Sequence, residues 1–107
     1  MKTYYIDGYI LKVGSNKEDN QELVEDSDKN YTWFHLSDYA SCHGIVNCSF
    51  DSIYSTLLYK CACKIKKNSK YSSETNVSVD YTKIENLKLT MNVGEVKYTK
   101  KPNKLKV

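Results

Sequence analysis

The sequence predicts a small, mainly β domain, and two observations lead to that prediction. Residues Thr3–Val13 alternate and are rich in Tyr and Ile, which is the pattern with a period of two that is typical of a strand. The chain has 107 residues with only one proline and four glycines, which is typical of one ordered domain and not of a linker.

The expected strands are one long first strand, in which Gly8 allows a bulge or bend, and four shorter ones, at residues 3–13, 31–36, 45–50, 59–66 and 76–82. Residues 14–30 read as a long polar and acidic connection that holds at most a helical turn.

Residues 51–67 fit two patterns. Apolar residues recur there at helical spacing, whereas from Tyr59 onward they also alternate with Lys60, Ala62, Lys64 and Lys66 as in a strand. We therefore expect a short helix over residues 51–58 and a strand over residues 59–66. Beyond the fifth strand, Gly94 allows a turn and residues 95–100 pair back as a hairpin.

Residues 1–100 are accordingly expected to form a single domain, and residues 101–107 a loose basic tail.

Charge is distributed very unevenly. Residues 1–52 hold four lysines against nine acids, and residues 53–107 hold twelve lysines against four acids, so the net charge of +3 conceals a basic second half. Such asymmetry is typical of a protein with an anionic partner. Every basic residue is lysine, which contacts phosphate as a point charge and does not read base edges in the bidentate way that arginine does.

Several segments resemble OB-fold nucleic-acid-binding domains, in the order and spacing that such domains have. The segments are Tyr5–Ile10, Trp33–Asp38, Gly44–Phe50, Lys60–Ile65 and Val77–Leu87. The pattern is similar to that of the anticodon-binding OB family, the N-terminal domain of the exonuclease VII large subunit and replication-protein-A-type domains. The resemblance implies a five-stranded OB-type Greek-key barrel, with a short helix between strands 3 and 4 and here a C-terminal β extension. Two features depart from it: Cys63 replaces a glycine of the fourth strand, and the first loop is acidic.

With Phe34 and Leu36 pointing into such a barrel, aromatic side chains of the first two strands would face outward, beside the lysines of the fourth strand and its loop. Aromatic rings on a basic groove are typical of proteins that bind single-stranded DNA or RNA with little sequence preference. The candidate nucleic-acid-binding residues are Tyr5, Tyr9, Tyr31, Trp33, His35, Lys60, Lys64, Lys66, Lys67 and Lys70.

Two other functions stay open. A protein-binding module, such as a small subunit of a complex or an inhibitor from a phage or mobile element, would use the acidic segment 14–30 against a basic partner. A zinc site would draw on Cys42, Cys48, Cys61 and Cys63, although their spacing is not that of common zinc sites, and small core side chains are the simpler interpretation.

No catalytic motif, cofactor-binding loop or apolar stretch of membrane-spanning length occurs in the sequence. We therefore expect a binding protein that is not an enzyme and needs no cofactor or metal. The absence of a signal-peptide pattern at the start favours an intracellular, cytoplasmic location.

Overall fold

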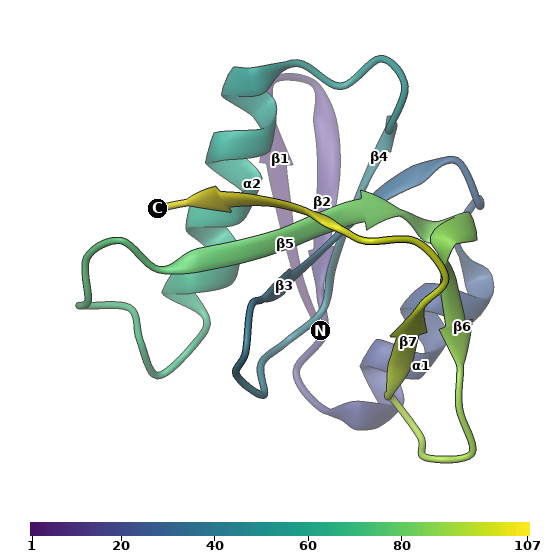
Figure 1. Ribbon diagram of the computed structural model, residues 1–107. Helices are drawn as coiled ribbons and strands as arrows, with labels where there is room; N and C mark the ends of the chain where they lie inside the picture. The colour runs from purple at the N-terminus through teal and green to yellow at the C-terminus, as the bar shows by residue number, and fades with distance from the viewer.

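A computed structural model describes all residues, 1–107, and its centre is a six-stranded antiparallel sheet (Figure 1). The strands, given in their order across the sheet, are β1 (Lys2–Ile6), β2 (Tyr9–Val13), β4 (Gly44–Ser49), β3 (Tyr31–Leu36), β5 (Ser78–Lys83) and β8 (Asn103–Lys106). The prediction of a β-rich domain is confirmed. The predicted closed barrel is wrong, because β1 and β8 are two open edges of the sheet.

The first predicted strand is in fact a hairpin of β1 and β2. Asp7 and Gly8 both have positive φ angles, 52° and 85°, as the two central residues of a type I′ turn require. Lys2 pairs with Val13 and Ile6 with Tyr9, so the chain reverses at the point where we expected only a bend.

One face of the sheet is covered by a single helix, α2 (Ser55–Lys67). Its buried residues Leu57, Cys61 and Ile65 pack on Phe34 and Val46 of the sheet in the main hydrophobic core. The helical interpretation of residues 51–67 therefore holds along most of the segment, and the predicted strand over 59–66 is wrong. The cysteines are all free thiols, and no group of three or more His, Cys, Asp or Glu side chains is placed to hold a metal ion.

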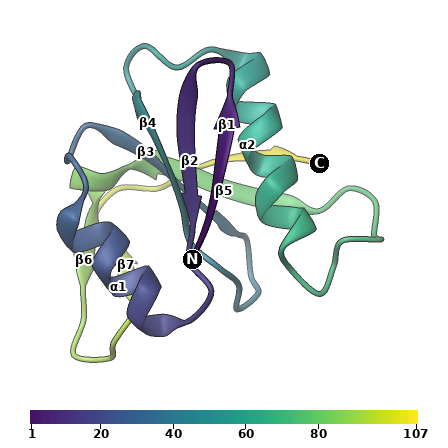
Figure 2. The ribbon, with the colours of Figure 1, turned by 180° about the vertical axis from the view of Figure 1, so that it is seen from behind.

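The other face is partly covered by α1 (Lys17–Asp26) and by a small hairpin of β6 (Leu87–Leu89) and β7 (Val96–Tyr98) (Figure 2). A short 3-10 helix, η1 (Ile84–Asn86), leads from β5 into β6. This layer encloses a second core around Trp33, whose ring is fully buried. The acidic connection predicted at residues 14–30 thus contains a real helix, whereas the predicted hairpin before residue 100 is confirmed.

The C-terminal residues are a strand and not a loose tail. β8 pairs with β5, and Val107 exchanges two backbone hydrogen bonds of 2.9 Å with Val77. In Figure 1 this segment is the yellow strand beside β5, near the C-terminus. No helix combines the length and the apolar character that crossing a membrane demands.

Candidate nucleic-acid interface

A stripe of lysines runs along one flank of α2, beside the edge strand β1. Lys60, Lys64 and Lys67 lie at i, i+4 and i+7, which places them on one side of the helix; we call them the lysine stripe. Lys64 Nζ lies 5.0 Å from the centre of the Tyr4 ring on β1, a cation–π distance. Since α2 rises about 1.5 Å per residue, the three ammonium groups are spread over roughly 10 Å along the helix axis.

The first lysine of the stripe is already paired. Lys60 Nζ contacts Asp7 Oδ1 of the β1–β2 turn at 2.9 Å, and the hydrogen bond from Lys60 holds the pKa of the Asp7 carboxyl below its usual value. Lys64 and Lys67 form no ion pair, so their charges are available to a partner.

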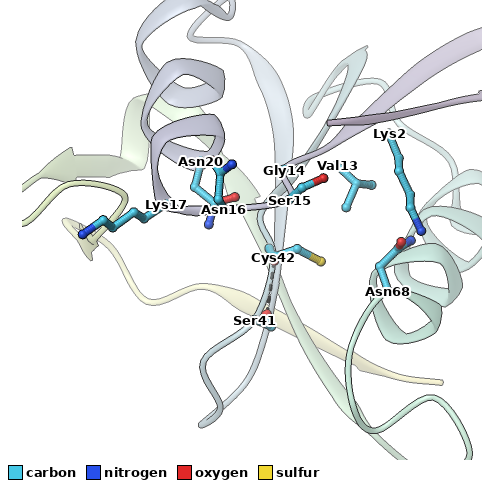
Figure 3. Close-up of a pocket in the computed structure, with 10 residues that line it drawn as sticks. All are labelled: Lys2, Val13, Gly14, Ser15, Asn16, Lys17, Asn20, Ser41, Cys42 and Asn68. Carbon is cyan, nitrogen blue, oxygen red and sulfur yellow. Dashed lines mark hydrogen bonds between the residues drawn. The ribbon is translucent and has the colours of Figure 1, made fainter.

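A polar pocket of about 460 Å³ lies beyond the C-terminal end of the stripe (Figure 3). Lys2 reaches across from β1 toward Asn68, the residue that ends α2, while Asn16 and Asn20 stand on the opposite side (Figure 3). Asn68 Nδ2 donates to the Tyr4 hydroxyl at 2.9 Å, which ties the end of α2 to β1. Lys2 forms no ion pair and extends the positive charge of the stripe toward this pocket.

The two helices carry opposite charge on opposite faces of the sheet. The exposed side of α1 presents Glu18, Glu22, Glu25 and Asp26, and no basic residue lies in its last turn. In α2 the last turn holds three lysines and the first turn no acid. A polyanion is therefore drawn to the lysines of α2 and repelled from the exposed surface of α1 itself.

The ten predicted site residues do not form one groove. Trp33 is 0% exposed and belongs to the second core, so it cannot stack on a base at the surface. His35 is half-buried, and its ring stacks on that of Trp33 with 5.6 Å between ring centres. Alternation along β3 placed both correctly on the face opposite Phe34; the error was to treat that face as open.

The other predicted aromatics are divided between the two faces. Tyr5 is 81% exposed on β1, and Tyr31 is half-buried beside α1 on the same face. Tyr9 points to the α2 face, where its ring lies 6.5 Å from that of Tyr54. Of the predicted aromatics, the tyrosines and the half-buried His35 can be reached from solvent, and they are not gathered beside the lysines.

The predicted lysines are on α2 and after it, not on a strand. Lys66 is half-buried on the flank away from the stripe, and Lys70 is exposed in the loop that follows the helix. Sequence reasoning missed Lys2 and Tyr4, which join the stripe from β1. Their alternation with Ile6 was a usable signal, once the Asp-Gly turn had fixed β1 as a separate edge strand.

An open antiparallel sheet, with α2 on one face and α1 and a small hairpin on the other, makes the chain a small β-rich domain with a basic helix flank along one edge. A family model described as "NFACT protein RNA binding domain" matches residues 2–100, and the chain belongs to this family. The match agrees with the expected nucleic-acid-binding class and assigns the chain to a different family from the three named for the OB-fold resemblance.

Known proteins resemble the chain over most of its length. It is 31% identical over 97 residues to a coiled-coil domain-containing protein 25 homolog of Dictyostelium discoideum, covering 84% of this chain and 47% of that protein. It is 30% identical over 95 residues to the Bos taurus coiled-coil domain-containing protein 25, covering 82% of this chain and 46% of the relative. The chain thus spans about half the length of the curated relatives it matches.

A solved structure has the same fold. It is the C-terminal part of the fibronectin/fibrinogen-binding protein of Streptococcus suis, with a TM-score of 0.87 and 25% sequence identity, covering 98% of this chain and 43% of that one.

Proposed function

We propose that this domain binds single-stranded RNA, without catalysis, by holding successive phosphates on the flank of α2. The observation that carries the proposal is the set Lys2, Lys64 and Lys67, three lysines free of ion pairs on one surface of a chain from an RNA-binding family. Lys60 joins them when an RNA phosphate replaces Asp7. The acidic face of α1 supports the same choice of surface, because it disfavours RNA along that helix.

Binding by lysine point charges predicts strong salt dependence and little sequence preference. For single strands the slope of log K against log salt is about −0.7 per phosphate neutralised, so four lysine contacts give a slope of roughly −3. The sequence holds no arginine, and bidentate contacts to guanine are therefore not part of this interface.

The test is fluorescence anisotropy of a labelled oligouridylate across a salt series, with oligothymidylate beside it to compare RNA and DNA. Replacing Lys64 and Lys67 together with glutamine is expected to reduce the slope by about 1.4 and to weaken binding for every sequence alike. The matched control replaces Lys88 and Lys97, a cross-strand lysine pair on the β6–β7 hairpin. Equal loss in both double variants, or wild-type binding by the stripe variant, would contradict the proposed surface.

A second candidate function rests on α1. Its exposed acids Glu18, Glu22 and Glu25 form one charged side that is complementary to a basic protein segment. Replacing these three with glutamine distinguishes the two functions, because RNA binding should be unchanged or stronger, whereas binding of a lysine-rich peptide should be lost.

A further inference from the structure

A second pocket, of about 560 Å³, lies on the α1 side of the sheet, and the proposed function does not use it. It is bounded by the loop between β3 and β4, by β7 and by β8. Its wall includes Trp33, His35, His43, Tyr98 and Asp80, with Tyr39 among the exposed residues that line it. We call it the aromatic pocket.

Four aromatic rings are packed together in its wall. The imidazole of His35 stacks on Trp33 at 7° between planes, while His43 and Tyr98 meet the indole edge-on, with ring centres 5.1 and 5.7 Å away. Tyr98 is 38% exposed and His35 is half-buried, so these two rings are the ones that a bound molecule would meet first. A wall of this composition suits a flat aromatic ligand.

Two polar atoms of the wall lack partners. Trp33 Nε1 and His43 Nδ1 are both buried, and neither forms a hydrogen bond. Leaving a buried polar group unpaired typically costs about 1–3 kcal/mol, and an occupant recovers part of that cost only if the rings of the wall shift enough to expose these two atoms. Trp33 Nε1 can only donate, whereas a neutral His43 can donate or accept at Nδ1 according to its tautomer.

The imidazoles are uncharged at neutral pH. Burial lowers the pKa of His43 to about 3, helped by the nearby His35, and burial also lowers the pKa of His35. The one cation of the pocket, Lys104, is bound to the Asp80 carboxylate at 2.6 Å. The pocket therefore offers stacking surfaces and neutral hydrogen-bonding atoms, which suit a nucleobase and not a phosphate.

A network of hydrogen bonds holds the wall in place. The hydroxyl of Tyr98 donates to Asp80 Oδ2 at 2.7 Å, and Ser37 and Lys104 donate to Oδ1. Burial raises the pKa of the Asp80 carboxyl, but these hydrogen bonds outweigh it and keep the pKa below its usual value. The Tyr98 ring is thus positioned before any ligand arrives.

The aromatic pocket adjoins the lysine-rich segment through a pair of stacked tyrosines. Tyr39, in its wall, stacks on Tyr71 with 4.3 Å between ring centres, and Tyr71 directly follows Lys70. The pair joins the wall of the pocket to the loop that follows the lysine stripe. We propose that the aromatic pocket takes one unstacked nucleobase of the bound RNA; this rests on the proposed function.

The sole tryptophan reports on the pocket directly, since Trp33 lies in its wall. We expect an oligouridylate or oligoadenylate to change Trp33 fluorescence, and an oligomer of abasic sugar-phosphate units of the same length to leave it unchanged. The abasic oligomer should also bind about 5- to 100-fold more weakly by competition in the anisotropy assay, as loss of one stacked base implies. Nucleoside monophosphates are titrated separately, and their effect on Trp33 fluorescence distinguishes binding of a free nucleotide from binding of a base within a strand.

The variants for this test are Tyr39→Ala and His35→Ala, with Tyr5→Ala as the control for loss of an exposed aromatic elsewhere. The first two should reduce the preference for based over abasic oligomers, and Tyr5→Ala should not. Circular dichroism melting identifies any variant that fails to fold, and the exposed Tyr39 keeps the test decisive if His35→Ala does so.

The outcomes separate the two proposals. If labelled RNA binds while Trp33 fluorescence and the based-to-abasic ratio stay unchanged, the base pocket is overturned and the lysine surface stands. If no RNA binds, the proposed function is overturned, and a Trp33 response to nucleoside monophosphates alone would reassign the pocket to free nucleotides. A response to tyrosinamide or argininamide without any response to nucleotides would overturn the base pocket in favour of a protein side chain.

Discussion

Acid should destabilise the domain through His43, and the substitution His43→Gln should remove that effect. His43 directly precedes β4, and its imidazole is buried in the wall of the aromatic pocket. The centres of the Trp33 and His35 rings both lie 5.1 Å from the centre of the His43 ring. Burial lowers its pKa from 6.5 to about 3. The folded state thus resists a proton that the unfolded chain accepts.

The sign and the size follow from that difference. Because the folded pKa is the lower one, the contribution of His43 to stability is complete above pH 6.5 and is lost as the pH falls from 6.5 toward 3. Between pH 7 and pH 5 the free energy of unfolding should fall by about 2 kcal/mol from this residue alone. That is a large share of the roughly 5–15 kcal/mol typical of small domains.

Urea unfolding followed by circular dichroism at pH 7 and pH 5 measures the effect. The glutamine variant will be less stable at pH 7, so the quantity to compare is each protein's change between the two pH values. His35 titrates in the same direction and is present in both proteins, whereas the pKa of Asp80 is lowered from 3.8, so its effect begins only at lower pH. Equal pH dependence in the two proteins would refute the argument that His43 is buried without a charge partner.

Three further predictions concern the frame of the domain, and urea unfolding measures each of them. Gly94→Ala should lower the free energy of unfolding by about 2–4 kcal/mol, because φ is +80° and a new Cβ would lie 2.6 Å from the carbonyl oxygen of Lys17. Its matched control is Gly8→Ala, where φ is +85° but no atom lies within 4 Å of the new Cβ. That substitution should lower the free energy of unfolding by only about 1–2 kcal/mol. Leu57→Ala, at a fully buried position of α2, should cost about 2–5 kcal/mol, and a loss under 1 kcal/mol would mean that the main core is misplaced. Deleting residues 102–107 should destabilise the domain and expose β5 as a new edge; unchanged stability would show that β8 does not belong to the folded unit.

The sequence contained the signal for the first hairpin, and it was misinterpreted. Asp-Gly between two runs of alternating residues is a strong short-range hairpin signal, because both residues accept the positive φ of a type I′ turn. Treating Gly8 as a bulge kept β1 and β2 in one strand. The resulting element count matched a five-stranded barrel, and the barrel prediction followed from it.

The two helices were hidden for different reasons. In α1 only Leu23 and Val24 are buried, so there was almost no apolar periodicity to detect, although Asn16 caps the helix by accepting a hydrogen bond from Asp19 N. In α2 the helical stripe was visible, and the choice between helix and strand depended on the alternation of Lys60, Ala62, Lys64 and Lys66 with apolar residues. Side chains on a helix flank satisfy that alternation as well, and only the packing of Cys61 and Ile65 on the sheet decides between the two.

The position of Trp33 connects the fold to the candidate interface. Alternation along β3 predicts which side of the sheet a residue faces but not what covers that side, because α1 shows almost no apolar pattern and the β6–β7 hairpin comes from a distant part of the chain. Their packing turns the expected binding face into a second core, and the basic residues proposed to bind RNA lie instead on the α2 flank beside β1. The exposed acids of α1 lie on one side of the sheet, and the lysine stripe of α2 lies on the other. Substitutions in the stripe and on the exposed side of α1 should therefore act independently on stability, whereas a substitution at Trp33 would disturb both the second core and the aromatic pocket.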